Sequence, residues 1–342
     1  MIIQDLKLKD FRNLKKYEIS FCKSTNLIYG LNGVGKTSLL EAIFLLAFGK
    51  SFLNRKKSDL VNQDANEFIL RLTCAHPHGF CQVSASYDNR FLLFLNEKKT
   101  NIFEINHYLY PVFFSSSDYN LYIENIPHAR KMIDRFIFGV YPLYIRYILG
   151  YNRALKQKNF LLKRTQDISE LRSWNKIMSE LAEKILDIKM KFIEKLNTEI
   201  TGKFNRDLTV HCRPSLKIEQ GISRTSFFQQ MESLRESELK AQRSLLGPHL
   251  DGFDILLKSK PLKFYSSGEK KIHLLMIYIS FIELFKRLKQ EYPVFLLDDF
   301  DTAIDSENID FLMKNYPEMQ VIATSVSTNH DFHRLIQLKK EN

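Results

Sequence analysis

The chain has 342 residues, 44% of them hydrophobic, which is enough for one large or two ordinary globular domains, and its four cysteines are too few for a disulfide scaffold. Lys and Arg outnumber Asp and Glu by 50 to 39, and the net charge of +11 indicates a polyanionic partner, nucleic acid before membrane, unless it serves only solubility. Charged residues among the first ten argue against a secretory leader, and the apolar runs are too short to span a membrane, so we expect a cytoplasmic protein without a membrane partner.

The first predicted elements are three strands that lead into a loop. Apolar and polar residues alternate over residues 3–8 and 17–21, with a turn at residues 11–14 between them, and residues 26–29 form a short apolar run. The next segment reads GLNGVGKTS, which is a complete phosphate-binding loop. A Gly-rich turn that matches this motif by chance is the alternative.

Each residue type in this loop has a chemical purpose. The three glycines let the backbone turn sharply and present its N–H groups to phosphate oxygens. Lys36 would reach the β- and γ-phosphates and Thr37 would bind Mg²⁺, while the apolar stretch 39–46 predicts a helix whose N-terminus faces the phosphates. We therefore expect ATP and Mg²⁺ as cofactors. The predicted binding residues of the loop are Gly30, Leu31, Asn32, Gly33, Val34, Gly35, Lys36, Thr37 and Ser38.

Four possible ligands of a soft metal cluster within eight residues. They are Cys74, His76, His78 and Cys81. The cluster lies between two alternating, strand-like runs, and its spacing matches no common zinc signature. We therefore expect a hairpin turn at this place, with a metal site as the weaker alternative.

Helical periodicity dominates from about residue 118 to residue 234. The clearest apolar stripe consists of Leu181, Ile185, Ile188, Phe192, Leu196 and Ile200, at steps of three or four. It covers only a few heptads, so we expect a helical arm and not a long coiled coil. A strand-like pattern returns near residues 253–257, before a helical stretch over about 268–289.

A second anion site is predicted where that last helix begins. Residues 265–269 read YSSGE and resemble the LSGGQ signature of ABC-type ATPases. Ser266 and Gly268 would offer a hydroxyl, backbone N–H groups and the helix dipole to a phosphate. In ABC-type heads the signature of one subunit closes on the nucleotide held by another, so ATP joins a homodimer and hydrolysis opens it. An ordinary Ser-Ser-Gly helix cap is the alternative.

The apolar run 294–297 ends in two carboxylates, which is the Walker B pattern. Asp298 would hold Mg²⁺, and Asp299 would orient or deprotonate the attacking water, which makes Lys36, Asp299 and Ser266 the predicted catalytic residues. A strand that ends at a solvated turn is the alternative for Asp298 and Asp299. Because Lys36 and Asp298 are so distant in sequence, the helical stretch must be an insertion. We expect an ATPase core over residues 1–117 and 246–342, including a β-rich N-terminal part, and an inserted helical domain over 118–245.

With these three motifs in order, the chain resembles the RecF family of bacterial recombination and repair ATPases, which is related to SMC heads. The resemblance runs nearly end to end and includes further strings: Leu40–Ile43 with Phe48–Phe52, Tyr151–Asn159, Leu246–His249 and Leu296–Asp299. It implies an α/β fold, namely an ABC/SMC-type P-loop ATPase head completed from both chain ends, with an inserted, mainly helical arm.

The resemblance also implies a function in DNA replication, DNA damage, the SOS response and recombination. The family binds single-stranded and double-stranded DNA at gapped junctions as an ATP-closed dimer, and RecO and RecR are partners in loading RecA. Nothing in the chain reads bases, so we expect contacts to the DNA backbone. The candidates for these contacts, which also suit a merely solvated face, are Lys50, Arg55, Lys56, Lys57, Arg153, Lys156 and Lys158.

The chain departs from the family pattern at four places. Leu250 stands where the family has Arg, Glu269 replaces the usual Gln, and residues 114–118 and 323–326 differ from the usual strand ends. We therefore expect a weak ATPase. Two alternatives stay open: another SMC-like head with a chromosome-structural or phage-defence role, and a nucleotide-gated DNA-binding protein without significant hydrolysis. A transporter ATPase subunit fits less well, because the arm is too basic and too large.

Overall fold

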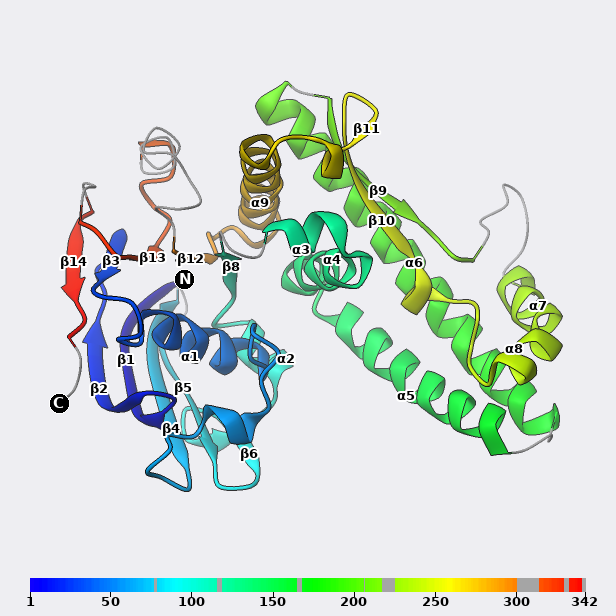
Figure 1. Cartoon of the computed structure of the whole chain (residues 1–342), viewed down its shortest axis with the longest axis horizontal. Helices are drawn as coiled ribbons and strands as arrows, with labels where there is room; N and C mark the ends of the chain where they lie inside the picture. Colours follow the sequence, from blue (N-terminus) through cyan, green and yellow to red (C-terminus); the bar gives the residue numbers. More distant parts are fainter. Residues whose placement is uncertain are drawn as a thin grey trace. The chain divides into compact units, whose positions relative to one another are not determined.

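The computed structural model describes residues 1–76, 79–115, 119–164, 168–205, 207–216, 225–299, 314–328 and 332–339. The chain divides into two compact units (Figure 1). The first, called here the core unit, is Met1–Tyr119 with Ile282–Asn342, and the second, the arm unit, is Asn120–Phe281. The first boundary lies close to the one expected after residue 117, whereas the second comes after residue 281 and not after residue 245.

The later second boundary has a physical reason in the contacts of the arm unit. Strand β10 (Gly252–Leu257) pairs with β9 (Leu208–Arg213) of the arm. Helix α9 (Ser267–Lys289) packs its first part on the arm helices, since the ring of Phe281 stacks on Phe136 with centroids 4.1 Å apart. The signature segment therefore belongs to the arm unit.

A parallel sheet forms the centre of the core unit. Among the described residues its strands lie in the order β14-β3-β13-β12-β8, and every neighbouring pair is parallel. The strands β8, β12 and β13 are buried at every residue, as is typical of parallel strands covered on both faces. The bounds are β3 Thr25–Tyr29, β8 Pro111–Ser115, β12 Val294–Asp298, β13 Val321–Ser325 and β14 Arg334–Gln337.

A second, antiparallel sheet of the core unit has the order β2-β1-β4-β5-β6-β7 among the described residues. Its strands are β1 Ile2–Phe11, β2 Leu14–Ser20, β4 Phe68–His76, β5 Gly79–Tyr87, β6 Phe91–Leu95 and β7 Lys98–Lys99. Helix α1 (Lys36–Phe48) contacts strands of both sheets, and all its residues except Thr37 are buried. Burial on both sides explains why residues 39–48 of this helix are apolar on every face except at Glu41. The core unit also contains η1 (Lys57–Leu60) and α2 (Ile102–Asn106).

The cysteine and histidine cluster lies at the end of the β4–β5 hairpin. Cys74 and Cys81 are paired residues on these two strands, and both are buried. His78 lies outside the described residues. Within the described part of the chain, no group of three or more His, Cys, Asp or Glu side chains is arranged to hold a metal ion.

The arm unit is mainly helical. Helices α5 and α6 pack along each other (Figure 1). The predicted stripe on α6 is largely buried, and Ile185, Phe192, Leu196 and Ile200 belong to the core. The helices are α3 Tyr119–Glu124, α4 Ile126–Val140, α5 Leu143–Arg164, α6 Ile168–Phe204, α7 Thr225–Ser233 and α8 Arg235–Ala241. The short elements η2 (Pro248–Leu250), β11 (Lys260–Pro261) and η3 (Leu262–Phe264) follow before α9.

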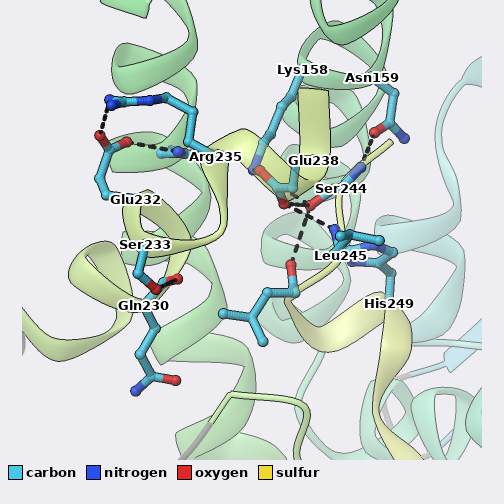
Figure 2. Close-up of polar contacts among 12 residues, drawn as sticks. Lys158, Asn159, Gln230, Glu232, Ser233, Arg235, Glu238, Ser244, Leu245 and His249 are labelled. Carbon is cyan, nitrogen blue, oxygen red and sulfur yellow. Dashed lines mark hydrogen bonds and ion pairs between the residues drawn. The ribbon is translucent and has the colours of Figure 1, made fainter. Parts of the chain in front are cut away.

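Two buried ion pairs connect α8, and the segment 242–251 that follows it, to the helices α5 and α6 of the arm. Lys158 Nζ lies 2.6 Å from Glu238 Oε2, and both side chains are only 1% exposed. Glu238 Oε1 accepts hydrogen bonds from the Ser244 hydroxyl at 3.0 Å and from the Leu245 N–H at 2.9 Å (Figure 2). Burial lowers the pKa of Lys158, and Glu238 opposes that shift. The expectation that Lys158 contacts DNA is therefore wrong, because its ammonium is buried in an ion pair.

A similar pair lies where this segment ends. Lys189 Nζ donates to Asp251 Oδ2 at 2.8 Å, and both side chains are buried. Asp251 Oδ1 accepts from the Ser215 N–H at 3.0 Å, and the Arg130 guanidinium donates to the Asp251 carbonyl oxygen at 2.8 Å. The Leu246–His249 string noted in the sequence thus lies between two buried anchors.

We expect Lys158→Met to lower the free energy of unfolding by about 3–5 kcal/mol, because it leaves the Glu238 carboxylate buried without its cation. Urea unfolding followed by circular dichroism measures this change. Lys156→Met is the matched control: this residue is exposed on the same helix, and we expect a change below about 0.5 kcal/mol. Equal effects of the two substitutions would contradict the structural role of the buried pair.

Candidate nucleotide-binding site

The phosphate-binding loop connects β3 to α1. Gly35 immediately precedes α1 with φ 110°, and a Cβ there would lie 2.8 Å from Leu14 Cδ2. At Gly30, with φ 156°, a Cβ would lie 2.5 Å from the carbonyl oxygen of Leu338. Both positions therefore require glycine, for backbone conformation and for space. The loop presents the N-terminus of α1, where backbone N–H groups and the helix dipole favour an anion.

Lys36 is the first residue of α1, and its side chain reaches back to the start of the loop. Its Nζ donates to the carbonyl oxygens of Gly30 at 2.7 Å and Leu31 at 3.1 Å, and the residue is 5% exposed. Phosphate oxygens are stronger acceptors for an ammonium group than these carbonyls, because the hydrogen bond is then assisted by charge on both sides. The geometry thus places a preorganised cation where a phosphate would bind.

Two hydroxyl side chains, one on α1 and one on the neighbouring strand β13, meet at the Asp298 carboxylate. Its Oδ1 accepts hydrogen bonds from the Thr37 hydroxyl at 3.1 Å and the Thr324 hydroxyl at 2.7 Å. Asp298 is 6% exposed and ends β12, while Thr324 lies on β13, between β12 and β3. A carboxylate beside a threonine hydroxyl supplies the hard oxygen ligands that Mg²⁺ prefers, so these residues fit the ion.

Asp299 follows with a backbone conformation that non-glycine residues rarely adopt. Its φ is 47°, and its N–H donates to the Thr324 hydroxyl at 2.9 Å. Such strained positions persist where surrounding contacts enforce them, and they cluster at functional sites. Thr324 therefore touches both acidic residues of the Walker B pair. Sequence reasoning missed this role, since residues 323–326 were noted only as a departure from the family pattern.

The turn between β1 and β2 supports the loop from the other side. Asn13 Nδ2 donates to the Gly33 carbonyl at 2.9 Å, and Asn13 Oδ1 accepts from the Ser38 hydroxyl at 2.8 Å. Arg12 beside it forms an ion pair with Glu41 at 2.8 Å. The pKa of Arg12 is lowered, chiefly by burial, although the charges of Glu41 and Asp298 oppose this shift. Both turn residues were predicted only as a turn, because nothing local in the sequence links them to the loop.

A cavity of about 680 Å³ lies beside the loop in the core unit. Its lining combines Lys36, Thr37 and Asp299 with three further cations, Arg12, Lys15 and Arg55. The volume lies within the range typical of small-molecule sites, and the charges suit a phosphorylated ligand with a metal ion. The segment 114–118, noted above as a departure, lies partly outside the described residues, at 116–118.

The signature residues belong to the arm unit and form a capping box at the start of α9. The Ser266 hydroxyl donates to Glu269 Oε2 at 2.7 Å, and the Ser266 N–H donates to the same oxygen at 3.1 Å. These hydrogen bonds lower the pKa of Glu269. The space beside Gly268 is open, since a Cβ built there would meet no atom of the described residues within 4 Å, apart from its chain neighbours and its own helix backbone. The signature segment thus forms a helix cap in the arm unit. The predicted residues Lys36, Thr37, Asp298 and Asp299 lie together in the core unit.

The family model described as RecF/RecN/SMC N terminal domain matches residues 2–341. The DNA replication and repair protein RecF of Acetivibrio thermocellus is 32% identical over 343 residues, which cover 95% of this chain and 93% of that protein. The chain belongs to the RecF family. The RecF protein of Caldanaerobacter subterraneus is 29% identical over 96% of this chain and 94% of its own length.

Solved structures agree with this RecF-family assignment. A structure titled recombination mediator protein RecF-ATP in RecFOR pathway has a TM-score of 0.91 at 27% identity, covering 99% of this chain and 96% of that one. The Smc head domain of Pyrococcus furiosus, at TM-score 0.51 and 18% identity, shares the fold. The family resemblance and the ABC/SMC-type α/β fold predicted from the sequence are thus confirmed. None of the described helices has the length and apolar character needed to cross a membrane.

Proposed function

We propose that this chain is an ATP-dependent DNA-binding protein of gap repair and recombination. The observation that carries the proposal is the cluster formed by Lys36, Thr37 and Asp298, in which a loop cation, a hydroxyl and a carboxylate are arranged for a nucleotide with Mg²⁺. The relatives named DNA replication and repair protein, and the RecF structure titled with ATP, support the same assignment. ATP and Mg²⁺ are the proposed cofactors.

The proposed reaction is slow hydrolysis of ATP. Asp299 lines the cavity that holds Lys36 and Thr37, so its carboxylate orients or deprotonates the attacking water. Thr324 positions this residue through the N–H of Asp299 and holds the Asp298 carboxylate through its own hydroxyl. Lys36 balances the charge that develops on the phosphates.

The proposed assembly is a homodimer closed by ATP. The signature of one copy, with Ser266 and Gly268 at the start of α9, contacts the nucleotide bound by the loop of the second copy. The open space beside Gly268 supports this role, because it leaves room for a phosphate group. The Ser266 hydroxyl must then exchange its hydrogen bond with Glu269 for one with the nucleotide.

The proposed DNA contacts are made by exposed cations of both units, to the DNA backbone. Lys50, Arg55 and Lys56 are exposed after α1, and Arg153 and Lys156 are exposed on α5. Lys57 is less accessible, since its ammonium lies 4.6 Å from the ring centroid of Phe91. The proposed substrates are single-stranded and double-stranded DNA at gapped junctions, and the proposed partners are RecO and RecR, which assist RecA loading.

Fluorescence anisotropy of a labelled gapped duplex tests this proposal. The protein is titrated at one fixed, moderate salt concentration with Mg²⁺ and either ATP or ADP, because phosphate-driven affinity depends on salt. We expect at least tenfold tighter binding with ATP. Equal binding with the two nucleotides would show that the basic charge is uncoupled from nucleotide binding, and would favour an SMC-like head with a protein substrate.

A further inference from the structure

Glu41 is a fully buried carboxylate in the apolar helix α1, and the nucleotide chemistry described above does not use it. Its exposed fraction is 0%. It lies one helical turn after Thr37, and its neighbours along the helix are Leu40 and Ala42. A carboxylate in such surroundings is costly unless charged or polar partners satisfy it. Its partners therefore indicate why the helix carries an acid at this position.

The two carboxylate oxygens of Glu41 have different partners. Oε2 accepts a hydrogen bond from Arg12 Nη1 at 2.8 Å. Oε1 accepts a short hydrogen bond from the hydroxyl of Ser51. The Ser51 oxygen in turn accepts from the Leu53 N–H at 3.0 Å, within the loop that follows α1. The Glu41 side chain thus joins the β1–β2 turn to residues 50–57. This segment, called here the basic loop, carries Lys50, Arg55, Lys56 and Lys57.

Arg12 is held at its backbone as well as at its guanidinium. Its φ is 52°, its N–H donates to the Leu60 carbonyl at 2.8 Å, and its own carbonyl accepts from Asn62 Nδ2 at 2.7 Å. The side chain lines the cavity beside Lys36 and Thr37, and it is 19% exposed. With the backbone fixed in this way, the direction of the guanidinium depends on the ion pair with Glu41.

We propose that Glu41 is a positioning residue, which orients Arg12 in the nucleotide cavity and connects that orientation to the basic loop 50–57 through Ser51. The inference rests on the proposed nucleotide site. Arg55 of the same loop also lines the cavity, while Lys50 and Lys56 are exposed. A phosphate that attracts Arg12 therefore changes the ion pair with Glu41, and the hydrogen bond from Ser51 transmits that change to the loop.

Binding of a fluorescent ATP analogue, mant-ATP, to variants of the full chain tests this proposal. Arg12→Ala and Glu41→Gln are each expected to weaken the affinity about tenfold, which is the size of one charge-assisted hydrogen bond. The double variant should bind as weakly as Arg12→Ala alone, because Glu41 acts only through Arg12. A residue with a merely structural role would not produce this non-additivity.

Glu18→Gln is the matched control, since Glu18 forms an exposed ion pair with Lys7 at 2.6 Å in the same unit. We expect no change in its affinity for mant-ATP. Thermal unfolding of each variant verifies the fold. Wild-type affinity in Glu41→Gln, or additive losses in the double variant, would overturn the positioning role. If wild-type protein failed to bind mant-ATP, or if Lys36→Met bound it normally, the proposed nucleotide site itself would be wrong.

Ser51→Ala tests the connection to the loop and leaves the Glu41 carboxylate in place. In the wild type we expect saturating mant-ATP to slow hydrogen exchange in the peptide covering residues 50–57. The substitution should abolish this protection while affinity for mant-ATP changes less than about twofold, the scatter expected of a neutral substitution. Protection that persists in Ser51→Ala, or that is absent in the wild type, would overturn the connection.

Discussion

Replacing Lys36 with Met weakens ATP binding by at least about 100-fold, the largest loss of affinity that we expect from one substitution. The loop 30–38 carries one cationic side chain, that of Lys36, and its ammonium donates to the carbonyl oxygens of Gly30 and Leu31. Each charge-assisted hydrogen bond to phosphate contributes about 1.5–3 kcal/mol, and Met provides neither the donor nor the charge. Isothermal titration calorimetry with ATP and Mg²⁺ measures the change.

One control and one further variant make the Lys36 experiment specific. Lys16→Met removes an exposed lysine from the same unit, and we expect wild-type affinity. Lys36→Arg keeps the charge but not the compact ammonium, so we expect weakened nucleotide-driven dimerisation. Normal dimerisation and hydrolysis in the Lys36 variants would show that residues 30–38 are not a phosphate-binding loop.

Replacing Asp299 with Asn lowers the rate of ATP hydrolysis by about 10²–10³-fold and changes ATP affinity by less than about twofold, because the general base is lost while the shape is kept. The N–H of residue 299 still donates to Thr324, and Asn tolerates the positive φ of this position. Single-turnover phosphate release measures the rate. Light scattering after size exclusion, with ATP, measures the dimer.

The same substitution separates the two mechanisms that the sequence leaves open. A slow ATPase loses its turnover in Asp299→Asn and retains ATP-dependent dimers. If the wild-type rate is already negligible and Asp299→Asn leaves both rate and dimer unchanged, the protein is a nucleotide-gated clamp without significant hydrolysis. Loss of the ATP-dependent dimer in this variant would instead contradict the assignment of Asp299 to hydrolysis alone.

Candidate nucleotide-site residues that are contiguous in the sequence were predicted from the sequence, whereas candidates brought to the site by tertiary structure were not. The loop from Gly30 to Ser38 is readable because strand, turn and helix follow one another along the chain. Thr324 has no local signal of this kind. It contacts Asp298 because β13 lies between β3 and β12, an order that the sequence does not show. Asn13 contacts the loop, and Arg12 lines the cavity beside it, because the pairing of β1 with β2 places their turn there.

The sequence pattern also did not predict which charged residues are buried. Lys158 and Lys156 lie two residues apart in a basic stretch, yet one is buried against Glu238 and the other is exposed. The partners of Lys158 come from a segment some 80 residues further along the chain, whose path depends on how α5, α6 and α8 pack. Helical periodicity predicts which face is apolar, but it does not show that a lysine on that face has a buried partner.

By itself, the sequence indicated the family and its fold through the motifs that resemble those of the family, and it indicated the loop with Lys36 through the local backbone requirements of its glycines. Only the tertiary structure decided which hydroxyl holds Asp298, which acid orients Arg12, and that the signature segment belongs to the arm unit. The physical reason is that hydrogen bonds and ion pairs act over a few ångströms in space. The order of strands in a sheet, and the packing of helices, bring together residues whose separation in sequence carries no sign of that contact.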